Sequence, residues 1–293
     1  MSQASDVPGY AGGFISRHPA ATYFLLTFTV SWAGAFAVAA PQLLHHQSLS
    51  KMTGILMFPA MLLGPSLSGV VLTAVVDGRM SVRQLFSQML LARLPARWYL
   101  TLLIPPALVF SVLLLLRIFI SPAYIPNWFF AGTLFGIPAG FLEEIGWTGY
   151  AFPKMCSQNR ALTASIQVGL LWALWHLPVI NYLGAASPHG VYWLPFFLVF
   201  TFAMVAMRVL IAWIYTNTKS LLLTQLMHVS STSSLVIFSP SRVTAPQEVT
   251  WYAVYGAVLW LAVAIVVMIF GKELAHTSTK RGGSATPVSG DNV

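Results

Sequence analysis

The segment FLEEIGWTGY, residues 141–150, raises the first question about this chain. It places Glu143 and Glu144 side by side in a run that is otherwise apolar from about 128 to 150. A helix needs roughly 20 apolar residues to cross a bilayer, and a charged group inside such a helix costs about 2.5–3.5 kcal/mol. Two adjacent acids at this position therefore need buried partners or a chemical role.

The composition of the whole chain is that of a polytopic membrane protein. Its 293 residues are 57% hydrophobic and only 8% charged, with a mean hydropathy of +0.75, unlike an ordinary soluble domain. The single cysteine, Cys156, excludes an intrachain disulfide and a multi-cysteine zinc site. The net charge of +8 needs no nucleic-acid partner, because cytoplasmic loops of membrane proteins carry excess lysine and arginine.

Apolar runs long enough to span predict an all-α fold of about eight transmembrane helices. Several of these runs contain proline, so we expect kinks. The approximate limits are 22–40, 53–76, 98–120, 128–150, 162–183, 192–215, 220–238 and 250–270.

The basic residues predict that both termini are cytoplasmic. With an inside N-terminus, twelve of the fifteen lysines and arginines fall on the inner side, and only Lys51, Arg117 and Arg242 fall outside. Arg208 is counted with the inner group as a snorkelling anchor of the sixth run. The segment 81–97, with arginines among apolar residues, is interpreted as an amphipathic helix on the inner surface.

The domain organisation is expected to be simple. We predict a polar segment over 1–18, one transmembrane domain over 19–271, and a disordered cytoplasmic tail over 272–293 that is rich in glycine and serine. No cleavable signal is evident, so the first apolar run is expected to remain as a helix. The lipid bilayer is the expected environment.

Four titratable side chains fall within the predicted spans. Glu143 and Glu144 are the acids, and His176 and His228 are the histidines, while the other five acids and five histidines fall in loops or termini. The acids lie about 10 Å, and His228 about 12 Å, from the inner ends of their helices. Because each buried polar group needs a partner, we expect the four to share one polar cavity.

These residue types suit two hydrolytic routes, and the sequence leaves both open. Glu143, His176 and His228 could hold Zn²⁺ or another divalent metal that carries the attacking water, as in a metalloprotease. Without metal, Glu143 would deprotonate water together with His176, and His228 would donate to the oxyanion of a tetrahedral intermediate. Either route gives peptide-bond hydrolysis inside the membrane. Trp147, Trp172 and Trp175 are candidates to line the pocket.

The motifs resemble those of the CPBP family of intramembrane proteases, which includes CAAX prenyl proteases and bacteriocin-processing or self-immunity proteins. The resemblance rests on EEIGWTGYAFP from Glu143, on WALWHLP over 172–178, and on His228, and it covers a core of about 130–240. It implies an eight-helix core with a cytoplasmic cavity and a membrane-tethered peptide or protein substrate. It also implies a bacterial inner membrane as the location.

The resemblance assigns a role to each matching residue. Glu143 would be the water-activating glutamate, His176 its partner, His228 the third catalytic or metal-binding residue, and Glu144 a supporting acid.

Three positions depart from the family pattern. Trp172 stands where phenylalanine is usual, and Thr232 stands where asparagine is usual but keeps a hydroxyl donor. Thr148 stands where an arginine would neutralise Glu144 at i, i+4. Glu144 must therefore be protonated or paired with another residue.

Two other functions compete with the protease interpretation. A family member that has lost activity could serve as a membrane-bound immunity or binding protein. The buried acids and histidines could also form a proton or cation relay, although the chain shows no inverted repeat of the kind found in transporters.

Overall fold

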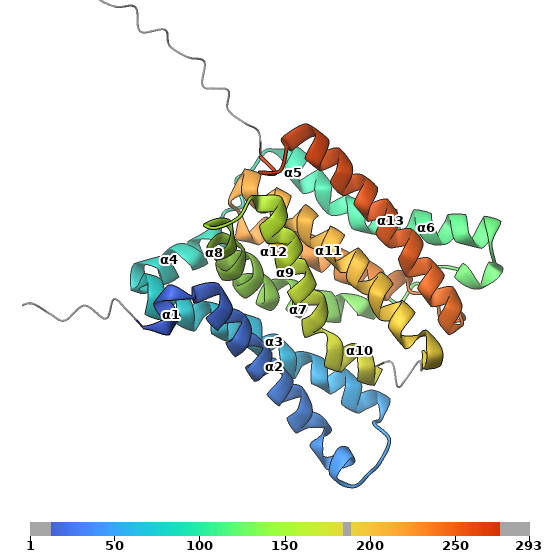
Figure 1. Ribbon diagram of the computed structural model, residues 1–293. Coiled ribbons are helices and arrows are strands. Elements are labelled where there is room, and N and C mark those ends of the chain that lie inside the picture. Colours follow the sequence, from blue (N-terminus) through green and yellow to red (C-terminus); the bar gives the residue numbers. More distant parts are fainter. Residues whose placement is uncertain (1–12, 184–188, 276–293) are drawn as a thin grey trace, which may run out of the picture.

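The computed structural model describes residues 13–183 and 189–275, and within these ranges the chain is a bundle of helices without strands (Figure 1). The all-α membrane fold predicted from composition is therefore confirmed. The α-helices are α1 (Phe14–Arg17), α2 (Pro19–Leu44), α3 (Lys51–Leu72), α4 (Arg79–Gln88), α5 (Ala96–Leu100), α6 (Ile104–Phe119), α7 (Thr133–Gly146), α8 (Phe152–Cys156), α9 (Ala161–Trp175), α10 (Leu177–Leu183), α11 (Trp193–Thr218), α12 (Leu221–Phe238) and α13 (Ala245–Phe270).

The described chain also contains shorter turns of other helix types. Two are π-helical, at Thr73–Asp77 and Trp147–Ala151. The 3₁₀ turns are Thr101–Leu103, Pro122–Tyr124, Phe130–Gly132 and Gly190–Tyr192.

Six helical stretches in the described part of the chain are long and apolar enough to cross a bilayer. They correspond to six of the eight predicted runs, and they cover Pro19–Leu44, Met52–Asp77, Ala96–Phe119, Gly190–Thr218, Leu221–Phe238 and Ala245–Phe270. The other two predicted runs, 128–150 and 162–183, are broken helices. These two runs carry both acids and His176.

The broken helices lie at the centre of the bundle. Helix α7 packs against α3 on one side and α12 on the other, whereas α9 packs against α11, which in turn contacts α13. Figure 1 shows α2 and α3 along one edge of the molecule and α6 and α13 along the opposite edge. The acids on α7 are thus shielded from lipid on several sides.

Glycines allow α7 and α12 to approach closely. A Cβ atom on Gly140 would lie 2.5 Å from the carbonyl oxygen of Gln225, and one on Gly136 would lie 2.1 Å from the hydroxyl of Ser233. Gly136, Gly140 and Glu144 are spaced four residues apart and share one face of the helix. The same face that packs on α12 therefore carries Glu144 to its partners one turn further along.

The two interruptions have local causes. At the first, the chain after Gly146 widens into the π-helical turn Trp147–Ala151, a feature often found at functional sites. At the second, α9 ends at Trp175 and α10 begins at Leu177, because Pro178 has no N–H to donate to the preceding turn. His176 lies at this junction.

Two predicted segment boundaries are wrong. Within the segment 81–97, α4 ends at Gln88, a non-helical stretch follows, and Pro95 directly precedes the short helix α5. The predicted disordered tail begins too early: Leu274 is fully buried, and its carbonyl accepts a bond of 2.7 Å from the Asn217 side chain. The remainder of that tail, from residue 276, lies outside the described residues, as do residues 1–12 of the polar N-terminal segment.

Candidate active site

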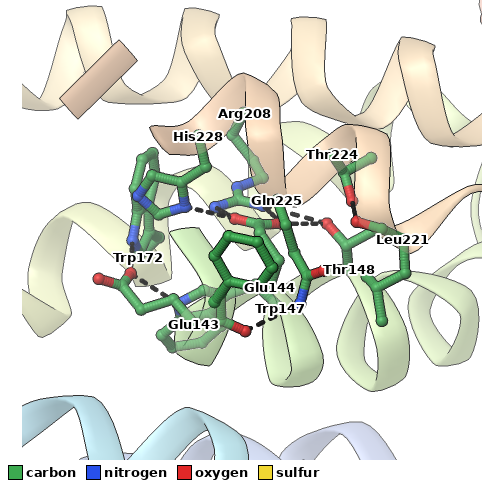
Figure 2. Close-up of polar contacts among 11 residues, drawn as sticks. Glu143, Glu144, Trp147, Thr148, Trp172, Arg208, Leu221, Thr224, Gln225 and His228 are labelled. Atoms are coloured by element: carbon green, nitrogen blue, oxygen red, sulfur yellow. Dashed lines mark hydrogen bonds and ion pairs between the residues drawn. The ribbon is translucent and has the colours of Figure 1, made fainter. Parts of the chain in front are cut away.

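Glu144 is the centre of the polar cluster. Its Oε1 accepts from His228 Nδ1 at 2.7 Å and from Arg208 Nη2 at 2.8 Å, and its Oε2 accepts from Arg208 Nη1 at 2.8 Å (Figure 2). The hydroxyl of Thr148 also donates to Oε2. This fully buried carboxylate is therefore paired on both oxygens by charge-assisted bonds, of which the Arg208 pair is bidentate.

The prediction that Arg208 is a snorkelling anchor is wrong. Its side chain is 1% exposed, and α11 continues to Thr218, so Arg208 lies ten residues, or about 15 Å, from the inner end of the helix. Its guanidinium turns inward because the buried Glu144 offers a bidentate partner. The sequence did contain a signal for this pair: Arg208 lies far from either end of an apolar run, and Glu144 lacks the arginine expected at position 148.

Glu143 has one occupied and one free oxygen. Its Oε2 accepts from the indole nitrogens of Trp172 at 2.7 Å and Trp147 at 3.1 Å. Its Oε1 is buried and has no hydrogen-bond partner among the described residues. A buried acceptor without a partner is costly, so this oxygen is the natural place for a water or a substrate group.

His176 meets the same cluster from the junction of α9 and α10. Its Nδ1 lies 2.8 Å from the carbonyl oxygen of Trp172. Because a carbonyl only accepts, Nδ1 carries the hydrogen, and in the neutral ring Nε2 is the acceptor. The ring makes edge contacts with Trp172 and Phe200, at centroid separations of 5.4 Å and 5.5 Å. The helix break thus aims His176 at the aromatic centre of the site.

Trp172 brings the predicted residues together. Its ring lies 5.2 Å from the ring of His228 and 5.4 Å from that of His176, centroid to centroid, while its N–H binds Glu143. Three of the four side chains predicted to share a site, Glu143, His176 and His228, therefore contact one indole, and Glu144 joins them through its bond with His228. Thr232 lies half-buried on α12, one turn beyond His228, and its supporting role stays a prediction.

The predicted metal ligands are not arranged around a common point. Among the residues that the structure describes, no group of three histidine, cysteine, aspartate or glutamate side chains could hold a metal ion. In this arrangement the set Glu143, His176 and His228 does not fit a divalent metal.

Cys156 and a cavity lie at the side that the charges predict to be cytoplasmic. Burial raises the pKa of the Cys156 thiol to about 11, so this residue is a poor nucleophile at neutral pH.

A cavity of about 510 Å³ lies between α4, α8 and the two π-helical turns, and reaches Gly149, next to Thr148. None of the four predicted catalytic side chains lines that cavity.

Comparison with known proteins agrees with this geometry. Residues 125–234, which hold both acids and both histidines, match the family model described as Type II CAAX prenyl endopeptidase Rce1-like. The chain is also 29% identical over 226 residues to CAAX prenyl protease 2 of Methanococcus maripaludis, an alignment that covers 70% of this chain and 80% of that protein.

The fold and the buried site define a polytopic helical membrane protein with a glutamate–histidine centre inside the bundle. The matches just described support the resemblance of the chain to the CPBP family of intramembrane proteases. The resemblance suggested by its three motifs is therefore confirmed.

Proposed function

We propose that this protein is an intramembrane endopeptidase of the CAAX-protease type, which uses Glu143 to activate water. One observation carries the proposal: Glu143 is held by two indole N–H groups on Oε2, while Oε1 is buried and has no partner among the described residues. A water on Oε1 would complete the hydrogen bonding of the carboxylate. It would also lie in a protein-lined site that includes the Trp172 indole, which contacts both imidazole rings.

In the proposed reaction, Glu143 takes a proton from this water as the water oxygen adds to the carbonyl carbon of the scissile bond. The tetrahedral intermediate then collapses, the C–N bond breaks, and the proton on Glu143 passes to the leaving amine. His176 orients the water through its free Nε2. No other reactant is consumed.

His228 is assigned to the oxyanion. Its Nδ1 faces the carboxylate of Glu144, so an imidazolium form would present Nε2–H to the substrate oxygen. Thr232, one turn further on α12, is the proposed second donor.

The archaeal relative indicates the substrate class. It is named a CAAX prenyl protease, so we take a C-terminal peptide anchored to the membrane as the first substrate to test, with and without a prenyl group. A bacterial inner membrane is the location that we propose for the reaction.

The role of a metal can be decided separately. If Zn²⁺ or another divalent ion takes part, Glu143, His176 and His228 are the residues that would hold it, and the ion would supply Lewis-acid activation of water. Since these side chains would have to rearrange, we favour the route without metal. Elemental analysis of the purified protein distinguishes the two routes.

The function is tested by Glu143→Gln. The amide keeps the size of the side chain but cannot take the proton, so cleavage should fall by a factor of about 10²–10⁴. The measurement is cleavage of a membrane-anchored peptide library by purified protein in proteoliposomes, followed by mass spectrometry. Wild-type activity in the variant, at equal expression and melting temperature, would refute the assignment.

A further inference from the structure

With threonine at position 148, this chain lacks the positive charge that the family pattern places next to Glu144. The family places an arginine there, one turn after the second glutamate, whereas threonine carries no charge. A buried carboxylate without a cationic partner is unfavourable. The chain nevertheless keeps Glu144 fully buried.

A guanidinium from another helix occupies the place that the motif arginine would reach. Arg208 Nη1 lies 2.8 Å from Glu144 Oε2 and 3.3 Å from the hydroxyl of Thr148. Thr148 and Glu144 are neighbours at i, i+4, so a long side chain at position 148 would extend into this same volume. The three groups lie together in Figure 2.

Two features of α9 allow the guanidinium to arrive from α11. A Cβ on Gly169 would lie 2.9 Å from the Val205 Cα and 3.2 Å from the Arg208 Cβ, so only glycine permits this close approach. One turn later, the face of Trp172 lies 4.3 Å from the guanidinium carbon, a cation–π contact that supports a desolvated arginine. Trp172 is also a position at which the chain departs from the family's phenylalanine.

We propose that Arg208 is a positioning residue that replaces the motif arginine from a different helix, with Thr148 and Trp172 as its matched partners. Through its bidentate pair, Arg208 fixes the Glu144 carboxylate, and Glu144 in turn fixes the ring of His228 through Nδ1. The catalytic part of this proposal rests on the proposed peptidase function.

The test exchanges the source of the guanidinium. Arg208→Met should lower kcat by about 10–100-fold with little change in KM, as for other partners that orient catalytic groups, and should lower Tm by about 10 °C. Adding Thr148→Arg to Arg208→Met should restore most of both. Thr148→Arg alone should lower Tm, because two guanidinium groups would then compete for one carboxylate.

The control is a second arginine–glutamate pair in the same chain. Arg160 and Glu273 are 3.8 Å apart, and both side chains are more than half exposed (65% and 58%). Arg160→Gln should therefore leave kcat unchanged and shift Tm by no more than about 2 °C. This variant separates the effect of the buried pair from the loss of any arginine.

The decisive result is that Thr148→Arg should lower Tm in the wild-type protein but raise Tm in the Arg208→Met variant. If Thr148→Arg is equally harmful with and without Arg208, or if Arg208→Met leaves kcat and Tm unaltered, the proposal is overturned while the Glu143 assignment stands. Rescue of Tm without rescue of kcat would also reject the positioning role. Should the wild type cleave no peptide, the peptidase function fails, and the Tm pattern alone still decides whether Arg208 replaces the motif arginine.

Discussion

Trp172 serves both acids with different parts of one side chain. Its N–H donates to Glu143 at 2.7 Å, and its face lies against the guanidinium that pairs with Glu144. Phenylalanine, the usual residue at this position in the family, could provide the face but not the donor. The indole therefore links the water-activating acid to the supporting acid.

Replacing Trp172 with phenylalanine removes the N–H donor but keeps an aromatic face, so it tests the hydrogen bond to Glu143 by itself. A hydrogen bond to a charged group contributes about 1.5–3 kcal/mol, so Trp172→Phe should lower kcat/KM by about 10–100-fold. Its Tm should fall much less than that of Arg208→Met. The matched control is Trp260→Phe on the outer helix α13, which removes a bond of 2.9 Å from the indole to the carbonyl of Phe202 on α11. Equal activity of Trp172→Phe and the wild type would contradict this role.

The site residues that could be predicted from sequence are the titratable side chains that lie within apolar runs. Acids and histidines inside apolar runs are conspicuous, so Glu143, Glu144, His176 and His228 could be named. Arg208 could not be paired with Glu144, because 64 residues separate them and spacing within one helix says nothing about a neighbouring helix. The bond from Trp172 to Glu143 was hidden for the same reason, whereas Trp147 is four residues from Glu143 and was already a candidate to line the pocket.

At the scale of elements, α7 combines packing and chemistry on one face. Its glycines bring α12 close, and Gln225 of α12 closes the contact by donating to the carbonyl of Phe141 at 2.9 Å. His228 follows Gln225 by one turn. Small residues let helices approach in the membrane, where apolar burial gives no driving force, so the site depends on this contact.

Enlarging one of these glycines should separate the helices. In Gly140→Ala the new Cβ would lie 2.5 Å from the Gln225 carbonyl oxygen and 2.8 Å from the Val229 nitrogen, and overpacking of this kind costs about 1–3 kcal/mol. We expect a lower Tm and weaker cleavage. The control is Gly13→Ala, where a Cβ would meet nothing within 4 Å, and it should change neither Tm nor cleavage. An unchanged Tm in Gly140→Ala would exclude a tight α7–α12 contact.

The apolar runs indicated where the helical stretches lie, because hydropathy reports burial in lipid, but in the described part of the chain only six of the eight are long and apolar enough to span. They did not reveal the π-helical turn after Gly146 or the break at His176. Both interruptions fall inside apolar sequence, and each is fixed by local backbone geometry together with packing against neighbours. Pro178 was the one visible indication of the second break.

At the scale of the whole molecule, the orientation stays a prediction. Twelve of fifteen basic residues favour cytoplasmic termini. A fluorescent protein fused to the C-terminus should therefore fluoresce, and alkaline phosphatase fused there should be inactive. Phosphatase inserted next to Arg242, in the loop between α12 and α13, should be active, and the reverse pattern would invert the topology.

The guanidinium that reaches Glu144 from α11 has a consequence for how genomes are searched. A motif search that requires an arginine four residues after the second glutamate rejects any chain that lacks it. The electric field at the carboxylate nevertheless depends on where the cation lies in space, and the helix that carries the cation does not matter. Chains set aside as degenerate for this reason should be screened for an arginine one helix away before they are discarded.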